Sequence, residues 1–201
     1  MSAGKLVPLA RPGAAAASAE LGDDELMLLA RGGRGAAFDE LVRRHQRRVL
    51  GVAARYVREP AQARDVAQNT FLELYRALPR YQPRGAFTSF LYRITLNECR
   101  MARRTARAED RRVEAAALQL SDDVEPETSE ARILARERER EAQRALDGLS
   151  EKLRAVAVLR YSGDLSYQEI AEVLGTPVGT VKRRLFDALE QLRRRLMEDP
   201  S

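Results

Sequence analysis

The sequence predicts an all-α protein built from two small helical domains. Aromatic residues make up 5% of the 201 residues and tryptophan is absent, while 44% are hydrophobic and many of these are alanine or leucine, a composition suited to packed helices. Apolar positions recur at three- and four-residue spacing along several segments, as they do in amphipathic helices. Helix start and stop residues then mark a compact pair of helices near the C-terminus.

The N-terminal segment 1–22 is expected to be a disordered tail. Pro8, Arg11 and Pro12 interrupt the apolar run that a signal peptide needs, and no later segment approaches the ~20 apolar residues of a membrane span. Cys99 is the only cysteine and His45 the only histidine, which excludes an intrachain disulfide and a Cys/His zinc cluster. We therefore expect a soluble protein of the reducing cytoplasm with no membrane insertion, metal or cofactor.

Residues 23–107 are predicted to form a first domain of four helices. The segment 36–58 places apolar side chains on one stripe, and His45 lies on that stripe. Because His45 has no carboxylate, cysteine or serine partner at helical spacing, we interpret it as lining the edge of the core and not as a catalytic group. This domain carries 17 arginines against 9 carboxylates, a balance that permits a polyanionic partner.

The next helix of this domain is predicted over 61–78, and Pro79 and Pro83 end it. A loop is expected over 80–86. A fourth helix starts near Phe87 and becomes more basic toward its end.

An acidic flexible linker is predicted over 108–135, with a short helix possible at 113–120. Residues 121–130 hold five carboxylates and no basic residue, and Pro126 interrupts them. The run ARERERE at 135–141 favours a helix. It leads into a second domain over 136–201.

A helix-turn-helix is predicted within this second domain, over 149–196. Ser166 can cap a helix start, with Glu169 three residues later, and Leu165 and Ile170 occupy the positions of a hydrophobic staple.

The second helix of the motif follows a tight turn. Gly175 is placed to stop the first helix, Thr176 to cap the second, and Pro177 to take its first position. At 100° per residue, one side of this second helix is apolar and faces inward. The opposite side is polar and suited to the major groove of DNA, although a solvated charged face is the simpler alternative.

Four ordered motifs, AFDELVRRH, ARDVAQNTFLELYRAL, FTSFLYRITLN and LSYQEIAEVLGTPVGTVKRRL, resemble the extracytoplasmic-function (ECF) group of bacterial RNA polymerase sigma factors. The resemblance covers about residues 24–196. It implies a promoter-melting first domain (sigma region 2) and a promoter-anchoring second domain (sigma region 4), with no catalytic site of the protein's own.

The resemblance implies that the first domain binds the beta-prime and beta subunits of core RNA polymerase. The residues implied in this contact are Asp65, Val66, Gln68, Asn69 and Phe71. Helical spacing places Asp65, Gln68 and Asn69 off the apolar stripe, free to meet a partner. An ordinary solvent-exposed face is the alternative.

The resemblance assigns opening of the minus-10 element to the fourth helix and the loop before it. The implied residues are Tyr81, Arg84, Phe90, Tyr92, Arg93, Asn97 and Arg100. An amide at Asn97 can read the edge of a flipped base, the aromatic rings can stack on unpaired bases, and the arginines can follow phosphates. For Phe90 and Tyr92, burial in the core is the alternative.

Recognition of the minus-35 element falls to the helix-turn-helix. Its candidate residues are Thr176, Gly179, Thr180, Lys182, Arg183, Arg184, Phe186 and Asp187. The resemblance also implies an anti-sigma factor as a partner. It implies a linker that passes through the RNA exit channel, for which solubility alone is the alternative explanation.

Two other protein classes are alternatives to a sigma factor. A stand-alone helix-turn-helix regulator would bind duplex DNA, usually as a dimer, but it would have no use for Asn97 and the surrounding aromatic residues. An enzyme finds no support, because the sequence has no glycine-rich phosphate loop, no metal cluster and no nucleophile placed with His45.

Overall fold

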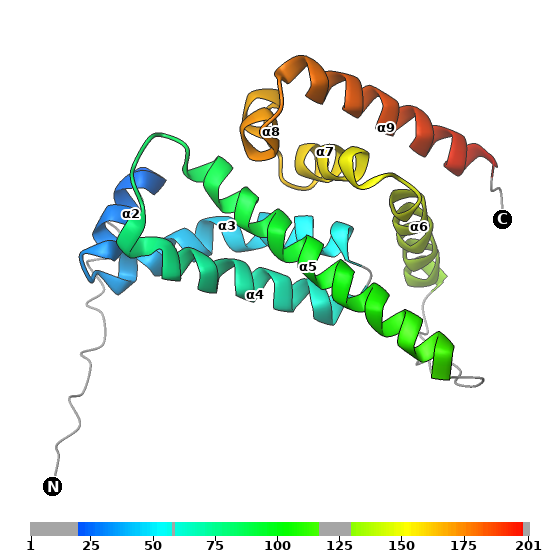
Figure 1. Ribbon diagram of the computed structural model, residues 1–201, viewed down its shortest axis with the longest axis horizontal. Coiled ribbons are helices and arrows are strands. Elements are labelled where there is room, and N and C mark those ends of the chain that lie inside the picture. The colour runs from blue at the N-terminus through cyan, green and yellow to red at the C-terminus, as the bar shows by residue number, and fades with distance from the viewer. Residues whose placement is uncertain (1–19, 58, 117–129, 199–201) are drawn as a thin grey trace, which may run out of the picture.

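The computed structural model describes residues 20–57, 59–116 and 130–198. In these ranges the chain is all-helical, as predicted, and it folds into two groups of helices (Figure 1). The predicted N-terminal tail lies almost entirely outside the described residues.

The first domain contains the four helices expected. They are α2 (Asp23–Arg31), α3 (Gly35–Tyr56), α4 (Pro60–Ala77) and α5 (Phe87–Ala116), with a 3-10 turn η1 (Leu78–Arg80) after α4. Pro60 stands at the start of α4, where its missing N–H costs nothing. Leu26, Leu41, Leu74 and Leu91 are fully buried between the helices.

The second domain contains α6 (Glu130–Asp147), α7 (Glu151–Tyr161), α8 (Tyr167–Leu174) and α9 (Val178–Glu198). The buried Arg154 of α7 donates hydrogen bonds to the carbonyl oxygens of Leu146, Asp147 and Leu149 at 2.8–3.0 Å. The first two of these carbonyls are at the end of α6, where they have no partner within the helix, and the third lies in the turn before α7. The charged side chain thereby fixes the angle between α6 and α7.

Both flanks of the predicted linker are helical. Helix α5 continues to Ala116 and α6 begins at Glu130, so helical residues occupy both ends of the predicted linker. The acidic stretch between them falls outside the described residues.

The two domains share one hydrophobic core, which the sequence analysis did not anticipate. Tyr92 and Leu96 of α5 pack in the same cluster as Leu159, Leu165 and Ile170 of the second domain, and all five are at most 1% exposed. Helix α8 lies against the first half of α5 (Figure 1). The molecule is therefore closed, with its second domain on one face of its first.

Candidate nucleic-acid interface

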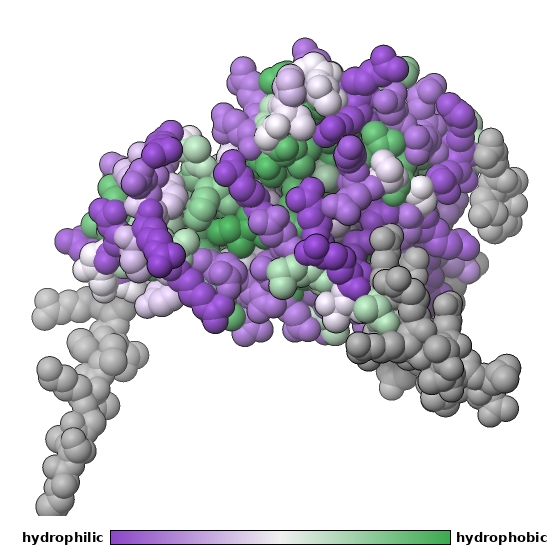
Figure 2. Space-filling model, in the orientation of Figure 1, coloured by the Kyte–Doolittle hydropathy of each residue, from purple (hydrophilic) through white to green (hydrophobic). Residues whose placement is uncertain are grey.

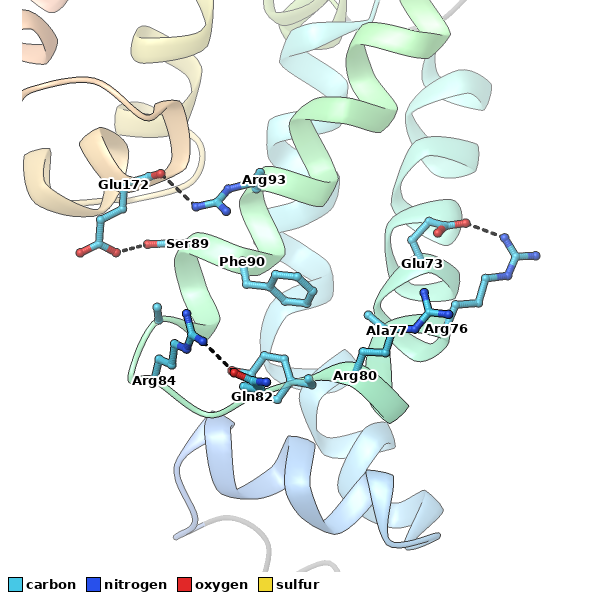
Figure 3. A pocket seen from close by; sticks show the side chains of 12 residues that line it. Glu73, Arg76, Ala77, Arg80, Gln82, Arg84, Ser89, Phe90, Arg93 and Glu172 are labelled. Carbon is cyan, nitrogen blue, oxygen red and sulfur yellow. Dashed lines mark hydrogen bonds and ion pairs between the residues drawn. The ribbon is translucent and has the colours of Figure 1, made fainter.

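A basic pocket opens where the loop 81–86 joins η1 to α5. It measures about 820 Å³ and is bounded by α4, this loop and the start of α5 (Figure 3). Its charged side chains are Arg76, Arg80, Arg84 and Arg93, with Glu73 and Glu172 as the acidic members. In Figure 2 most of the visible surface is hydrophilic, and apolar residues gather toward the middle, between the end that carries α2 and the second domain.

The pocket brings together four of the seven residues predicted to contact the minus-10 element. These are Tyr81, Arg84, Phe90 and Arg93. Phe90 is half-buried with its ring centroid 5.5 Å from that of Tyr81. Arg84 is exposed and donates a hydrogen bond of 2.7 Å to Gln82. A cationic surface beside an aromatic ring suits an unpaired strand, whose bases stack while its phosphates pair with arginine.

Tyr81 differs from its predicted role as a free stacking platform. Its side chain is buried, and its hydroxyl donates a hydrogen bond of 2.5 Å to Asp24 of α2. Burial, followed by that hydrogen bond to a carboxylate, raises the pKa of Tyr81 above its usual range. The ring therefore forms a fixed wall of the pocket and holds α2 against the loop.

Tyr92 also differs from its predicted role, because it lies in the core between the domains. It is 1% exposed, and its hydroxyl donates a hydrogen bond of 3.2 Å to the carbonyl oxygen of Gly163. Burial raises the pKa of Tyr92 to about 12. In this closed arrangement its ring cannot stack on a base, and the alternative reading of Tyr92 as a core residue holds.

Asn97 and Arg100 lie further along α5, outside the pocket. Asn97 is exposed. Arg100 is occupied by Glu151 of α7, with Nε and Oε1 2.7 Å apart. The structure thus places Phe90, Arg93, Asn97 and Arg100 along α5, with the pocket at its start and Tyr81 and Arg84 in the loop before it.

Residues missed by the sequence analysis complete the pocket. Arg76, at the end of α4, and Arg80, at the end of η1, both line the pocket, and their spacing of four residues was visible in the sequence. Ser89 and Glu172 also line the pocket. They lie 83 positions apart, and nothing in the sequence indicates their contact.

The predicted polymerase-binding residues of α4 divide into an exposed set and a buried set. Asp65, Gln68 and Asn69 are exposed, as helical spacing predicted. Val66 is 3% exposed and Phe71 is partly buried against the first-domain core, so these two offer less surface to a partner than the polar residues do.

A second pocket, of about 410 Å³, lies between this face of α4 and α5. Asp65 and Asn69 line it together with Glu98 and Met101 of α5. Burial, and then the nearby charge of Glu73, raises the pKa of Glu98. Two large apolar side chains, Leu72 and Tyr75, stay 45% and 59% exposed on α4. Sequence reasoning missed both, although their spacing from Asn69 continues the same helix face.

Most of the predicted helix start and stop residues of the helix-turn-helix are confirmed. Ser166 Oγ accepts from the Glu169 N–H at 3.2 Å, and the Glu169 carboxylate accepts from the Ser166 N–H at 2.8 Å, which is the reciprocal capping box. Leu165 and Ile170 are both buried. Gly175 has a φ of 60°, the left-handed conformation that glycine adopts without strain.

The predicted start of α9 was wrong in its details. The helix begins at Val178, and the carbonyl oxygen of Pro177 accepts from the N–H groups of Thr180 and Val181. Pro177 therefore occupies the capping position that was assigned to Thr176. Within the residues the structure describes, the buried Thr176 hydroxyl has no hydrogen-bond partner.

Helix α9 packs with one side and presents the other to solvent. Val181, Leu185 and Ala188 are buried, as the periodicity predicted, whereas Leu189 was also expected inside and is 42% exposed. The candidate side chains on the opposite side are accessible: Gly179, Lys182, Arg183 and Phe186 are exposed and Thr180, Arg184 and Asp187 are partly so.

Two contacts orient charges on this face of α9. Arg183 Nε lies 3.7 Å from Asp187 Oδ1. Lys182 Nζ stands 5.8 Å from the ring centroid of Tyr167, which Arg160 also approaches, at 5.4 Å. The face is cationic and largely free of the rest of the chain.

His45 lies at the edge of the first-domain core, where the sequence analysis placed it. Its Nε2 is 2.8 Å from Asp23 Oδ2, and its ring centroid is 5.1 Å from that of Phe87. The carboxylate comes from α2, a different helix, so helical spacing could not reveal it.

Neither a metal site nor a membrane span is found within the described ranges. No group of three His, Cys, Asp or Glu side chains is placed to hold an ion. None of the helices described is long and apolar enough to cross a bilayer.

Two family models match the chain, one on each domain. They are Sigma-70 region 2, over residues 41–109, and Sigma-70 region 4, over residues 139–192. Among named proteins, the chain is 35% identical over 176 residues to the RNA polymerase sigma-H factor of Pseudomonas aeruginosa, covering 85% of this chain and 91% of that protein. It is 33% identical over 187 residues to the ECF RNA polymerase sigma-E factor of Haemophilus influenzae, covering 88% and 96%.

Solved structures share the fold over most of the chain. CnrH, solved in complex with the cytosolic domain of CnrY, matches with a TM-score of 0.66 and 27% identity over 88% of this chain and 98% of that one. The fold is also that of the sigma factor RpoE from Bartonella quintana, solved with the anti-sigma factor NepR, at a TM-score of 0.60 and 19% identity over 81% and 98%. The two matched regions, together with identities of 33–35% to named sigma factors over most of both chains, show that the chain belongs to the ECF family of RNA polymerase sigma factors.

Proposed function

We propose that this sigma factor divides promoter recognition among three surfaces. The exposed side of α4 binds core polymerase, α9 reads the minus-35 element as duplex, and the basic pocket with the exposed side of α5 captures the opened minus-10 strand. The protein supplies specificity, and the polymerase supplies the catalytic site.

The basic pocket is the observation that carries this proposal. A reader of duplex DNA needs a recognition helix and phosphate contacts, and α9 with its neighbours provides those. It has no need for a recess in which four arginines surround a half-buried phenylalanine. Unpaired bases require such a surface, because stacking on an aromatic ring, worth about 1–3 kcal/mol per base, offsets the cost of unpairing.

Asn97 extends the strand site along α5. It is exposed two turns beyond Phe90, and its amide can both donate to and accept from a base edge. We assign it the flipped base, with Arg93 on the phosphates.

The contact with core polymerase is assigned to the exposed residues of α4. Asp65, Gln68 and Asn69 present polar groups, and Leu72 and Tyr75 add apolar area on the same helix. A helical partner needs this mixture of hydrogen-bonding groups and apolar anchors.

An anti-sigma factor is the proposed inhibitor. One structural neighbour was solved with a protein of that kind, and family membership extends the expectation to this chain. Cytoplasmic location follows from the same membership, since the polymerase acts there.

Run-off transcription of host genomic DNA, with sequencing of transcript 5′ ends, tests the function. Core polymerase with this protein should produce transcripts that start at a discrete set of promoters and are absent with core alone. A stand-alone regulator would bind DNA but leave the transcript profile of core polymerase unchanged, and that outcome would refute the sigma function.

A further inference from the structure

The second domain places carboxylates along the basic side of α5 in the closed molecule. Ser89 Oγ donates a hydrogen bond of 2.6 Å to Glu172 Oε2, Arg100 Nε lies 2.7 Å from Glu151 Oε1, and Arg103 Nη1 lies 2.7 Å from Asp147 Oδ1. We call Asp147, Glu151 and Glu172 the acidic row. Its members follow α5 from beyond Asn97 back to the basic pocket.

Glu172 enters the pocket itself. Its carboxylate and backbone lie at one edge of the lining, where Arg93 Nη2 donates a hydrogen bond of 3.1 Å to the Glu172 carbonyl oxygen (Figure 3). The donors that Glu172 occupies, a hydroxyl and a guanidinium, are those that a phosphate oxygen would accept from.

The acidic row thus resembles a nucleic-acid strand in its negative charge and in its path along α5. A nucleic-acid strand presents one negative charge per nucleotide to the cations beside it. Here separate carboxylates from α6, α7 and α8 meet successive positions of one helix. A closing surface selected for stability alone would need only the apolar cluster of Tyr92, Leu96 and their partners, since an ion pair as exposed as that of Arg100 with Glu151 contributes little.

Closure and promoter binding exclude each other on geometric grounds. The two promoter elements are centred roughly 25 base pairs apart, or roughly 85 Å of duplex at 3.4 Å per base pair. Helices α5 and α8 are instead in direct contact. A molecule that binds both elements must first separate α8 from α5.

We propose that the acidic row is a built-in mimic of the DNA backbone, which occupies the strand site of the free sigma factor until the domains separate. This inference rests on the proposed role of the pocket and α5 in binding the opened strand. It assigns the second domain a role in preventing the free protein from binding single strands.

Binding of a short fluorescein-labelled oligothymidylate to the full chain, measured by anisotropy at low salt, tests the mimic. The variant is the double substitution Glu151→Gln and Glu172→Gln, which removes two charges and keeps side-chain size. Asp147 is left in place because it also lies 3.8 Å from the buried Arg154. The matched control is Glu137→Gln with Glu190→Gln, which removes two exposed carboxylates of the same domain that are not members of the acidic row.

The double variant should bind the oligonucleotide about tenfold more tightly than wild type, as expected for loss of a competing charged acceptor. The control should bind like wild type, and the difference should shrink as salt screens the charges. Equal affinities of the double variant and the control would overturn the mimic. Thermal unfolding of both variants verifies that they fold.

Arg84→Ala separates failure of the mimic from failure of the strand site. Weaker binding by Arg84→Ala together with an unchanged double variant would refute the mimic alone. If neither substitution changes binding, the pocket is not the strand site and the proposed function of this region fails with the mimic.

Discussion

The two DNA-facing regions of this sigma factor are built in opposite ways. All the minus-35 candidates except Thr176 come from one helix, α9, where they are exposed or partly exposed and contact mainly their own neighbours, such as Arg183 with Asp187. The strand site draws on α4, η1, a loop and α5, and residues of the other domain cover part of it. The surface for duplex DNA is therefore accessible in the free protein, whereas access to the surface for single strands depends on how the domains are arranged.

The difference follows from the ligands. A duplex exists before the protein arrives, and a rigid helix that fits its major groove can stay ready. An opened strand exists only after melting, so a basic and aromatic surface left open would bind other polyanions meanwhile. Covering that surface with the second domain links strand binding to domain separation.

The largest expected effect concerns the core that the domains share. Leu159→Ala should lower the free energy of unfolding by about 2–5 kcal/mol, because the fully buried side chain leaves a cavity next to Tyr92 and Leu96. Denaturant unfolding followed by circular dichroism measures this. Leu189→Ala, at a 42% exposed leucine of the same domain, is the control and should change stability by less than about 0.5 kcal/mol. Equal losses would indicate that the two domains do not pack as described.

Arg183→Ala should weaken binding to minus-35 duplex by about 1–3 kcal/mol and leave oligothymidylate binding unchanged. The side chain of Arg183 is 81% exposed, so its removal leaves the fold intact. Gel shifts on the promoters found by run-off sequencing provide the measurement. Arg193→Ala, an exposed arginine further along α9, is the matched control. If both variants lose the same affinity, Arg183 contributes charge and no base reading.

A smaller effect is expected on the acid stability of the first domain. Hydrogen bonds from Arg43, at 2.7 Å, and from Arg44, at 2.8 Å, lower the pKa of Glu40 from 4.5 to about 2. A carboxylate with a lowered folded-state pKa contributes stability above its unfolded pKa and loses it as the pH falls through the folded value. The Glu40 contribution should therefore be complete above pH 4.5 and disappear toward pH 2.

Urea unfolding midpoints measured across this range check the acid dependence. Glu40→Gln should show a shallower fall in stability than wild type between pH 4.5 and 2. The exposed Glu190→Gln should keep the wild-type slope. A Glu40→Gln profile parallel to wild type would contradict the assigned pairing with Arg43 and Arg44.

Local rules predicted the helix-turn-helix closely and the strand site only in part. The box of Ser166 and Glu169 and the left-handed Gly175 depend on residues within a few positions, so the sequence contains the whole interaction. The start of α9 was misplaced by one residue because Thr176 and Pro177 each suit a helix start. Only the backbone decides between them.

Long-range contacts account for the rest. Helix α5 carries apolar residues on more than one side, since Leu91 faces the first-domain core while Tyr92 faces the second domain. Periodicity shows that such side chains are buried but not which domain buries them. The burial of Val66 is a further case of this kind. The contacts of His45 with Asp23 and of Ser89 with Glu172 could not be predicted either, because the partners are distant in the chain.

The division between the two regions is tested most directly by permanganate footprinting of holoenzyme with Asn97→Ala. This exposed residue is assigned to the opened strand alone. The variant should lose reactive thymines around the minus-10 element, while its binding of minus-35 duplex in gel shifts should be unchanged. Parallel loss of both signals, or normal opening by Asn97→Ala, would contradict this division.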